Sequence, residues 1–190
     1  MIKIQCPFCI TGLLMVALIF VSGLATECEA QSQPAHSATV ASNQAVKKHL
    51  DFSNRQDFED SKRGFIATDD PLVINDDNGE PVWDMRGYQF LSGEPVDTVN
   101  PSLWRQEQLN NIHGLFKIHE KIYQVRNFDL ANMTLIEGNT GWIVIDTLLT
   151  KETSKAAFAL ATEHLGEKPI KAIILTNLET FDPYFNIVTP

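Results

Sequence analysis

The sequence contains few cysteines, and all three lie within its first 28 residues, at Cys6, Cys9 and Cys28. A predicted export signal covers the same stretch, so the exported chain has no cysteine. Export normally favours disulfide bonds, yet this chain has neither a disulfide framework nor the thiolates of a cysteine metal site. Its folded part must therefore be stabilised by the burial of apolar side chains.

A run of apolar residues long enough to span a membrane is also missing. The longest run extends over 16 residues from Ile10 to Ala25, whereas a spanning helix needs about 20. The run follows a positive charge at Lys3 and precedes small residues that end at Ala30, which is typical of a secretory signal peptide cleaved after residue 30. We therefore expect export to the periplasm or through the secretory pathway. An uncleaved anchor, with which the chain would contact the membrane, and an incorrectly assigned start are the alternatives.

Positive charge is scarce as well. The chain has 15 Lys and Arg residues against 24 Asp and Glu residues, and its formal net charge is −9. Nucleic-acid binding rests on Lys and Arg side chains that neutralise phosphates, so nucleic acid is excluded as a partner. The 160 residues that remain after signal cleavage allow one domain.

The usual motifs of nucleophilic catalysis and phosphate binding are missing too. No serine lies in a Gly-x-Ser-x-Gly turn, and the glycines at 138 and 141 are not followed by the Lys-Ser/Thr of a phosphate loop. The acidic stretch 76–78 lacks the ligand spacing and closing glutamate of a calcium loop, which favours a plain turn. No two histidines have the spacing of a zinc chelate. The histidines are His36, His49, His113, His119 and His164.

The first part of the exported chain is predicted to have little regular structure. Residues 31–51 are polar and small, which is typical of a flexible lead, and a helical stretch is expected around residues 45–52. Two short apolar runs, 73–74 and 81–83, flank an Asn-Gly turn and predict a hairpin.

One helix is predicted in the next segment, over residues 101–111. Asn100 is a good N-cap, and Pro101 suits the first helical position. We interpret residues 52–114 as a largely irregular, partly helical N-terminal arm. The residues expected to share the apolar face of the helix are Leu103, Trp104 and Leu109.

Residues 115–176 carry a much clearer pattern of strands with one helix. The helix is predicted over Lys151–Leu165, where apolar residues recur at helical spacing, with Thr150 as N-cap and Gly166 as the stop. An order of strands, helix and strand predicts a mixed α/β or α+β fold in which helix packs on sheet. Strands are expected around residues 116–118, 122–126, 132–137, 141–146 and 170–175.

Asp146 has two interpretations. It ends an apolar strand just before the helix, so its carboxylate either lies near a metal or simply begins the next loop. The second interpretation is the more common one for an aspartate at the end of a strand.

Five separated motifs between residues 52 and 126 occur in an order that one hydrolase family shares. They are Phe52-Ser-Asn-Arg-Gln-Asp-Phe58, Arg63-Gly-Phe-Ile-Ala67, Val99-Asn-Pro-Ser-Leu-Trp-Arg-Gln106, Gly114-Leu-Phe-Lys117 and Ile122-Tyr-Gln-Val-Arg126. Together they resemble the linear alkylsulfatases, large exported zinc hydrolases of the metallo-β-lactamase superfamily that cleave long-chain alkyl sulfates such as dodecyl sulfate. The resemblance extends to residue 176 and implies that residues 115–176 form part of a metallo-β-lactamase-like domain.

The resemblance also implies a metal centre. In the family, the strand that matches residues 170–176 leads into a Thr-His-x-His-x-Asp-His loop, which holds two zinc ions together with more distant Glu and His residues. The zinc ions polarise the sulfate ester and activate a water molecule. A helical dimerisation domain and a sterol-carrier-like domain follow.

The sequence departs from the family at this loop. In an ungapped comparison, Asn177 and Glu179 stand at the first two histidines, Phe181 stands at the aspartate, and Asp182 stands at the third histidine. Residues 177–190 instead resemble the C-terminal ending of the family, so the middle of the protein is expected to be missing. A genomic deletion, an alternative transcript or a gene-model error would each have that result.

The sequence therefore predicts an inactive fragment of an exported zinc-dependent alkylsulfatase, with no catalytic, cofactor-binding or metal-binding residue of its own. Its apolar strands are of the kind that is covered by other elements on both faces of a sheet. Open sheet edges favour association with another chain. The alternatives are a secreted interaction protein that associates with full-length alkylsulfatase or with a second copy of itself, and a gene-model artefact without function.

Overall fold

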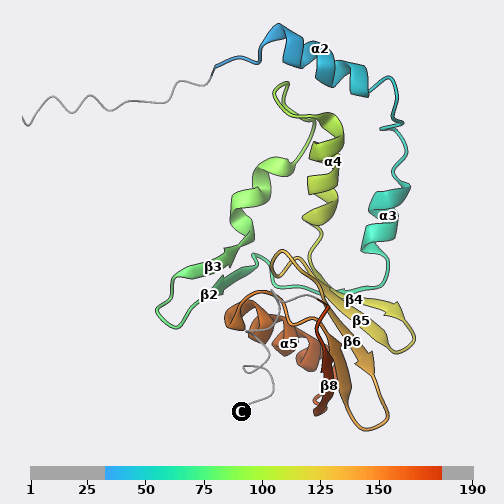
Figure 1. Ribbon diagram of the computed structural model, residues 1–190, viewed down its shortest axis with the longest axis vertical. Coiled ribbons are helices and arrows are strands. Elements are labelled where there is room, and N and C mark those ends of the chain that lie inside the picture. The colour runs from blue at the N-terminus through green and yellow to red at the C-terminus, as the bar shows by residue number, and fades with distance from the viewer. Residues whose placement is uncertain (1–32, 177–190) are drawn as a thin grey trace, which may run out of the picture. The chain divides into compact units, whose positions relative to one another are not determined.

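The computed structural model of the protein describes residues 33–176 (Figure 1). The chain divides into two units at residue 35, and nearly all of the described residues belong to the second. Across residues 33–176, the helices are all too short or too polar to cross a membrane. The predicted signal peptide and the predictions made for Asn177, Glu179, Phe181 and Asp182 lie outside the described residues.

A six-stranded sheet forms the centre of the second unit. All neighbouring strands are antiparallel except the last pair, which is parallel. The strands at 114–119, 122–126, 133–137, 142–145 and 170–174 confirm the predicted ones, while the first strand was not predicted. In spatial order the strands are β1 (Phe65–Ala67), β4 (Gly114–His119), β5 (Ile122–Arg126), β6 (Met133–Glu137), β7 (Trp142–Ile145) and β8 (Ile170–Ile174).

Helix α5 (Lys151–Leu165) connects β7 to β8 and has the predicted bounds. Thr150 and Thr153 form a capping box, in which each side chain accepts the backbone N–H of the other residue, and such a cap satisfies N–H groups that the first turn leaves unpaired. Figure 1 shows α5 against one face of the sheet. The apolar stripe of the helix joins the hydrophobic core there, together with residues from β5, β6 and β7.

A separate two-stranded hairpin extends this core. It consists of β2 (Val73–Asn75) and β3 (Pro81–Asp84), as predicted from the Asn-Gly turn. In the turn, the Asp76 carboxylate accepts the backbone N–H groups of Asn78 and Glu80 at 2.8 and 2.9 Å. Asp76 therefore has the role of a turn residue, in agreement with the simpler interpretation of the acidic stretch.

The arm contains more helix than the sequence predicted. It holds α3 (Gln56–Lys62), the 3-10 helix η2 (Met85–Leu91) and α4 (Pro101–Asn110), and a further helix, α2 (Ser37–Val46), precedes it. The prediction of a helical stretch around residues 45–52 is wrong, because the helix lies earlier, in the segment interpreted as a flexible lead. α2 buries none of its residues. A helix that buries nothing needs no apolar stripe, so its sequence lacks the pattern by which a helix is recognised.

Helix α4 begins as predicted, with the Asn100 side chain accepting the backbone N–H of Ser102. Its expected apolar face is partly wrong. Trp104 is buried and Leu109 is half-buried, but Leu103 is 54% exposed. Trp104 donates its indole N–H to the carbonyl of Gly93 at 3.1 Å, which holds the preceding loop against the helix.

Candidate functional site

The C-terminal ends of three strands, β5, β7 and β8, lie at the same edge of the sheet. β5 and β7 run in the same direction because both are antiparallel to β6, and β8 is parallel to β7. Three residues other than glycine in the loops at this edge have a positive φ angle, namely Asn127, Asp146 and Leu148. Because this conformation is unfavourable for side-chain-bearing residues, their clustering marks a constrained region of the kind found at functional sites.

Asp146 fixes the end of β8. Its carboxylate accepts the backbone N–H of Thr176 at 2.7 Å and the hydroxyl of Thr176 at 2.6 Å. Its own backbone N–H donates to the carbonyl of Ile174 at 2.9 Å. The side chain flagged in the sequence therefore has a positioning role, because it orients the chain directly before residue 177.

A second aspartate at this edge was not identified from the sequence. Asp129 is only 5% exposed, and its carboxylate accepts the backbone N–H groups of Ala131 and Leu149 and the hydroxyl of Thr153, at 2.7–2.8 Å. It thus ties the loop after β5 to the loop after β7 and to the first turn of α5. No sequence signal could have revealed this role, because its furthest partner is 24 residues away.

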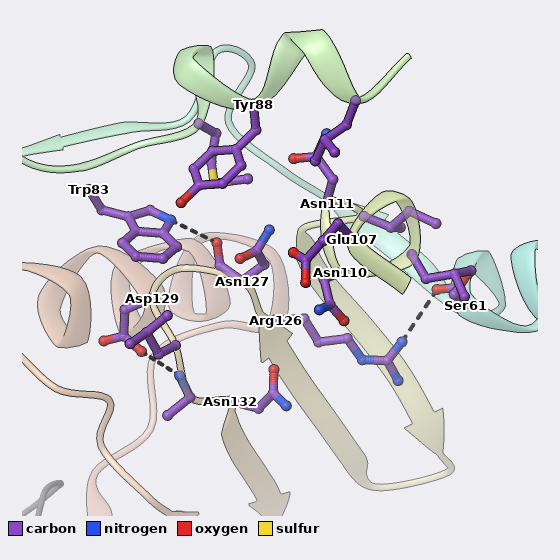
Figure 2. Close-up of a pocket in the computed structure, with 16 residues that line it drawn as sticks. Ser61, Trp83, Tyr88, Glu107, Asn110, Asn111, Arg126, Asn127, Asp129 and Asn132 are labelled. Carbon is purple, nitrogen blue, oxygen red and sulfur yellow. Dashed lines mark hydrogen bonds between the residues drawn. The ribbon is translucent and has the colours of Figure 1, made fainter. Parts of the chain in front are cut away.

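A cavity of about 310 Å³ lies between the arm and the loop that joins β5 to β6. Figure 2 shows Trp83 and Tyr88 on one side of it and Glu107 on the other, with Asn127 between them. The indole N–H of Trp83 donates to the carbonyl of Asn127 at 3.0 Å, which fixes the aromatic wall of the cavity to the constrained loop. Asn132 closes the side next to β6.

Arg126 also lines this cavity, but its guanidinium group is engaged in structural contacts. It donates to the carbonyl of Ser61 at 3.3 Å and to Gln124 Oε1 at 2.7 Å, and it lies 4.5 Å from the ring centre of Phe116. Burial lowers the pKa of Arg126. The side chain therefore connects α3 to the sheet through its Nε and Nη1 groups.

The described residues do not fit a two-zinc site. Within residues 33–176, no three His, Cys, Asp or Glu side chains lie close enough together to hold a metal ion. His36 caps α2 with its Nδ1 atom, and His113 contacts the carbonyls of Asn111 and Asp69. His119 and His164 are exposed on different elements.

Comparison with known proteins identifies the family. Residues 126–178 match the Metallo-beta-lactamase superfamily. The chain is 50% identical over 147 residues to the (R)-specific secondary-alkylsulfatase of Pseudomonas sp, covering 77% of this chain and 22% of that protein. It is 51% identical over 142 residues to the alkyl/aryl-sulfatase BDS1 of Saccharomyces cerevisiae, covering 74% and 22%. Over the matched residues, this chain is a relative of the alkylsulfatases of the metallo-β-lactamase superfamily.

The same family relation holds in three dimensions. The structure of the inverting sec-alkylsulfatase Pisa1 from Pseudomonas sp. matches with a TM-score of 0.77 and 48% identity, covering 84% of this chain and 25% of that one. This match confirms the predicted metallo-β-lactamase-like α/β fold. The linear primary-alkylsulfatase of Pseudomonas sp is 44% identical over 169 residues, which are 88% of this chain and 25% of that protein. The chain thus spans about a quarter of the length of the relatives it matches.

Proposed function

We propose that residues 52–176 are the N-terminal part of the catalytic domain of an alkyl sulfate ester hydrolase. The observation that supports this most strongly is the identity of 44–51% to three alkylsulfatases, together with the fixed end of β8. Asp146 holds Thr176 in place, and the family resemblance puts the metal-binding loop directly after this residue. In this proposal, the described part of the chain orients a catalytic loop.

The second step of the proposal is that the chain by itself does not hydrolyse alkyl sulfates. Hydrolysis by a metal-activated water requires a set of ligands. Residues 33–176 bring no three such side chains together, and residues 177–190 contain no histidine. Incubation of the purified chain with zinc and dodecyl sulfate is expected to release no sulfate above the metal-free reaction, with a full-length alkylsulfatase as positive control. Zinc-dependent release would disprove the inactivity.

A chimera tests the scaffold role separately from inactivity. Residues 52–176 would replace the matching segment of the Pseudomonas (R)-specific secondary-alkylsulfatase, which retains its own remaining sequence. We expect the chimera to hydrolyse its substrate, and Asp146→Ala in the chimera to lower kcat because the end of β8 loses its anchor. A folded chimera without activity would count against the scaffold role.

We also propose that the chain is exported. The proposal rests on the apolar run at 10–25 between Lys3 and Ala30. Sequencing the N-terminus of the protein recovered outside the cytoplasm is expected to give Gln31 as the first residue. Recovery of the chain with its first 30 residues intact in the cytoplasm would contradict export.

A second candidate function is association with full-length alkylsulfatase. It is favoured by β8, which is the last strand of the sheet and has Ile174 49% exposed. Within the described residues, no strand pairs with the outer side of β8, and such an edge is a template for another chain. Co-purification with the full-length enzyme would support this function, and sequencing the transcript across residues 176–178 would show whether the cell makes this chain.

A further inference from the structure

We infer that the cavity between the arm and the β5–β6 loop is a binding site for an uncharged, polyhydroxylated molecule such as a sugar. This inference goes beyond the proposed hydrolase scaffold and does not depend on it. A volume of about 310 Å³ is at the lower end of the range for small-molecule pockets, roughly 300–1,000 Å³. The size therefore fits a small ligand.

The polar groups of the cavity determine the class of ligand. Five lining side chains make no hydrogen bond to another group within residues 33–176, so their hydrogen-bonding atoms are available to a ligand. Glu107 offers only acceptors, the amides offer both donors and acceptors, and the tyrosine hydroxyl does both. The five side chains are Tyr88, Glu107, Asn111, Asn127 and Asn132.

A ligand with hydroxyl groups satisfies such a mixed set, because each hydroxyl donates one hydrogen bond and accepts others. A sulfate or phosphate group supplies acceptors only. It could approach the Arg126 guanidinium, whose Nε and Nη1 already donate to Gln124 and Ser61, but it would leave the Glu107 carboxylate and the amide oxygens without donors. A cation supplies donors only and would leave the amide N–H groups unpaired, which is costly once they are shielded from water.

The walls of the cavity support the same conclusion. Trp83 and Tyr88 contribute aromatic surface, and Leu91 and Leu109 contribute aliphatic surface. The C–H faces of a sugar ring pack against such surface while its hydroxyl groups point to the polar rim. The hydrogen bond from the Trp83 indole to the carbonyl of Asn127 fixes the aromatic wall relative to the polar side chains. Few side chains therefore have to become ordered when a ligand binds.

Saturation-transfer NMR on the full chain tests the site, with glucose, cellobiose and inositol as probes and sodium sulfate as the anionic comparison. We expect saturable binding of at least one of the three probes and none of sulfate. Glu107→Gln is expected to weaken binding about tenfold, because it removes a hydrogen bond to a charged group. Tyr88→Phe is expected to weaken it about fivefold, because it removes one neutral hydrogen bond.

Matched controls lie outside the cavity. Glu163→Gln changes an exposed residue of α5, and Tyr123→Phe changes a ring that packs on Trp142, so both should leave binding unchanged. Near-ultraviolet circular dichroism verifies that every variant is folded. Absence of saturable binding by all three probes, preferential binding of sulfate, or equal effects of the cavity and control variants would each overturn the inference.

Discussion

The sheet region and the arm are held together by different interactions. In the sheet region, residues 114–174, many large apolar side chains are almost completely buried, and Leu135, Trp142 and Val144 are at most 1% exposed. The helices of the arm, residues 52–114, rely more on polar side chains that reach backbone groups far away in the sequence. The sheet region is thus stabilised by a hydrophobic core, which the arm joins through Leu72, Ile74 and Met85. Helices α3 and α4 of the arm are instead held by a few specific long-range hydrogen bonds.

Arg105 is the clearest example of such a bond in the arm. Its guanidinium group donates to both carboxylate oxygens of Asp57, to the carbonyl of Phe52 at 3.2 Å and to the carbonyl of Asn54. These partners lie about 50 residues earlier in the chain. One side chain therefore fixes the entry to α3 against α4.

Two tryptophans allow the sharpest test of this difference. Trp142→Ala should lower the free energy of unfolding by about 3–5 kcal/mol, because it creates a cavity in the sheet core. Trp104→Ala should instead lower protection from hydrogen exchange mainly around residues 91–108, because local regions of a protein open independently. Urea unfolding and hydrogen exchange measure the two effects. Loss of protection in β6 and β7 on Trp104→Ala would contradict a separation of the two regions.

The buried carboxylate of the sheet region gives the next largest effect. Asp129→Ala leaves the backbone N–H groups of Ala131 and Leu149 without their acceptor, which should cost about 1–3 kcal/mol. The control Asp97→Ala changes an exposed aspartate of the arm and should stay within about 0.5 kcal/mol. Urea unfolding measures the free energy of unfolding of both variants. A similar loss of stability in the two would mean that Asp129 does not organise this edge of the sheet.

Arg105→Lys tests the polar anchoring of the arm. Lysine cannot reproduce the planar fork that reaches Asp57 and two carbonyls, so hydrogen exchange of residues 52–57 should become faster while β5 to β7 keep their protection. Arg63→Lys is the matched control, because the Arg63 side chain is 74% exposed and, within residues 33–176, forms an ion pair with Asp60 alone. Unchanged exchange after Arg105→Lys would show that the arm does not depend on this residue.

Acidification is expected to have the smallest effect, and to act through several exposed carboxylates together. The side-chain hydrogen bond from Arg105 lowers the pKa of Asp57, and the pKa values of Asp77, Asp84 and Glu137 are lowered by side-chain hydrogen bonds from Lys151, Arg86 and Lys168. A carboxyl group with a folded-state pKa below the unfolded value of about 4 stabilises the fold above that pH, and this stability is lost as the pH falls through the folded-state pKa.

The midpoint of thermal unfolding should therefore stay nearly constant between about pH 7 and pH 5 and fall below about pH 4. Asp57→Asn should reduce the size of that fall, because the variant has no charge to lose at this position. A midpoint that rises on acidification would contradict the sign of the effect.

The contrast between the two regions also explains what could be predicted from the sequence. Helix α5 has a long apolar stripe, a capping threonine and a terminal glycine, so its bounds were predictable. The short elements α3, β1 and η2 have seven residues or fewer and bury too few side chains to show a period. Helix α2 was placed wrongly because it buries nothing and uses His36 as its cap.

In the candidate site, too, local features were predictable from the sequence and long-range contacts were not. Asp146 was recognised because it ends an apolar strand, but its partner Thr176 lies 30 residues away. The cavity takes residues from η2, α4 and the β5–β6 loop, and only tertiary structure brings these segments together. The motifs that resemble the alkylsulfatases predicted the family correctly, because they are local stretches of sequence.

The central proposal is that this chain has part of the scaffold of an alkylsulfatase without its metal centre, and zinc stoichiometry tests it most directly. The purified chain would be dialysed to equilibrium against micromolar zinc and then analysed for metal, with a full-length alkylsulfatase treated in parallel. The account predicts two zinc ions per full-length protein and no stoichiometric zinc in this chain. One or two tightly bound zinc ions per chain would contradict it.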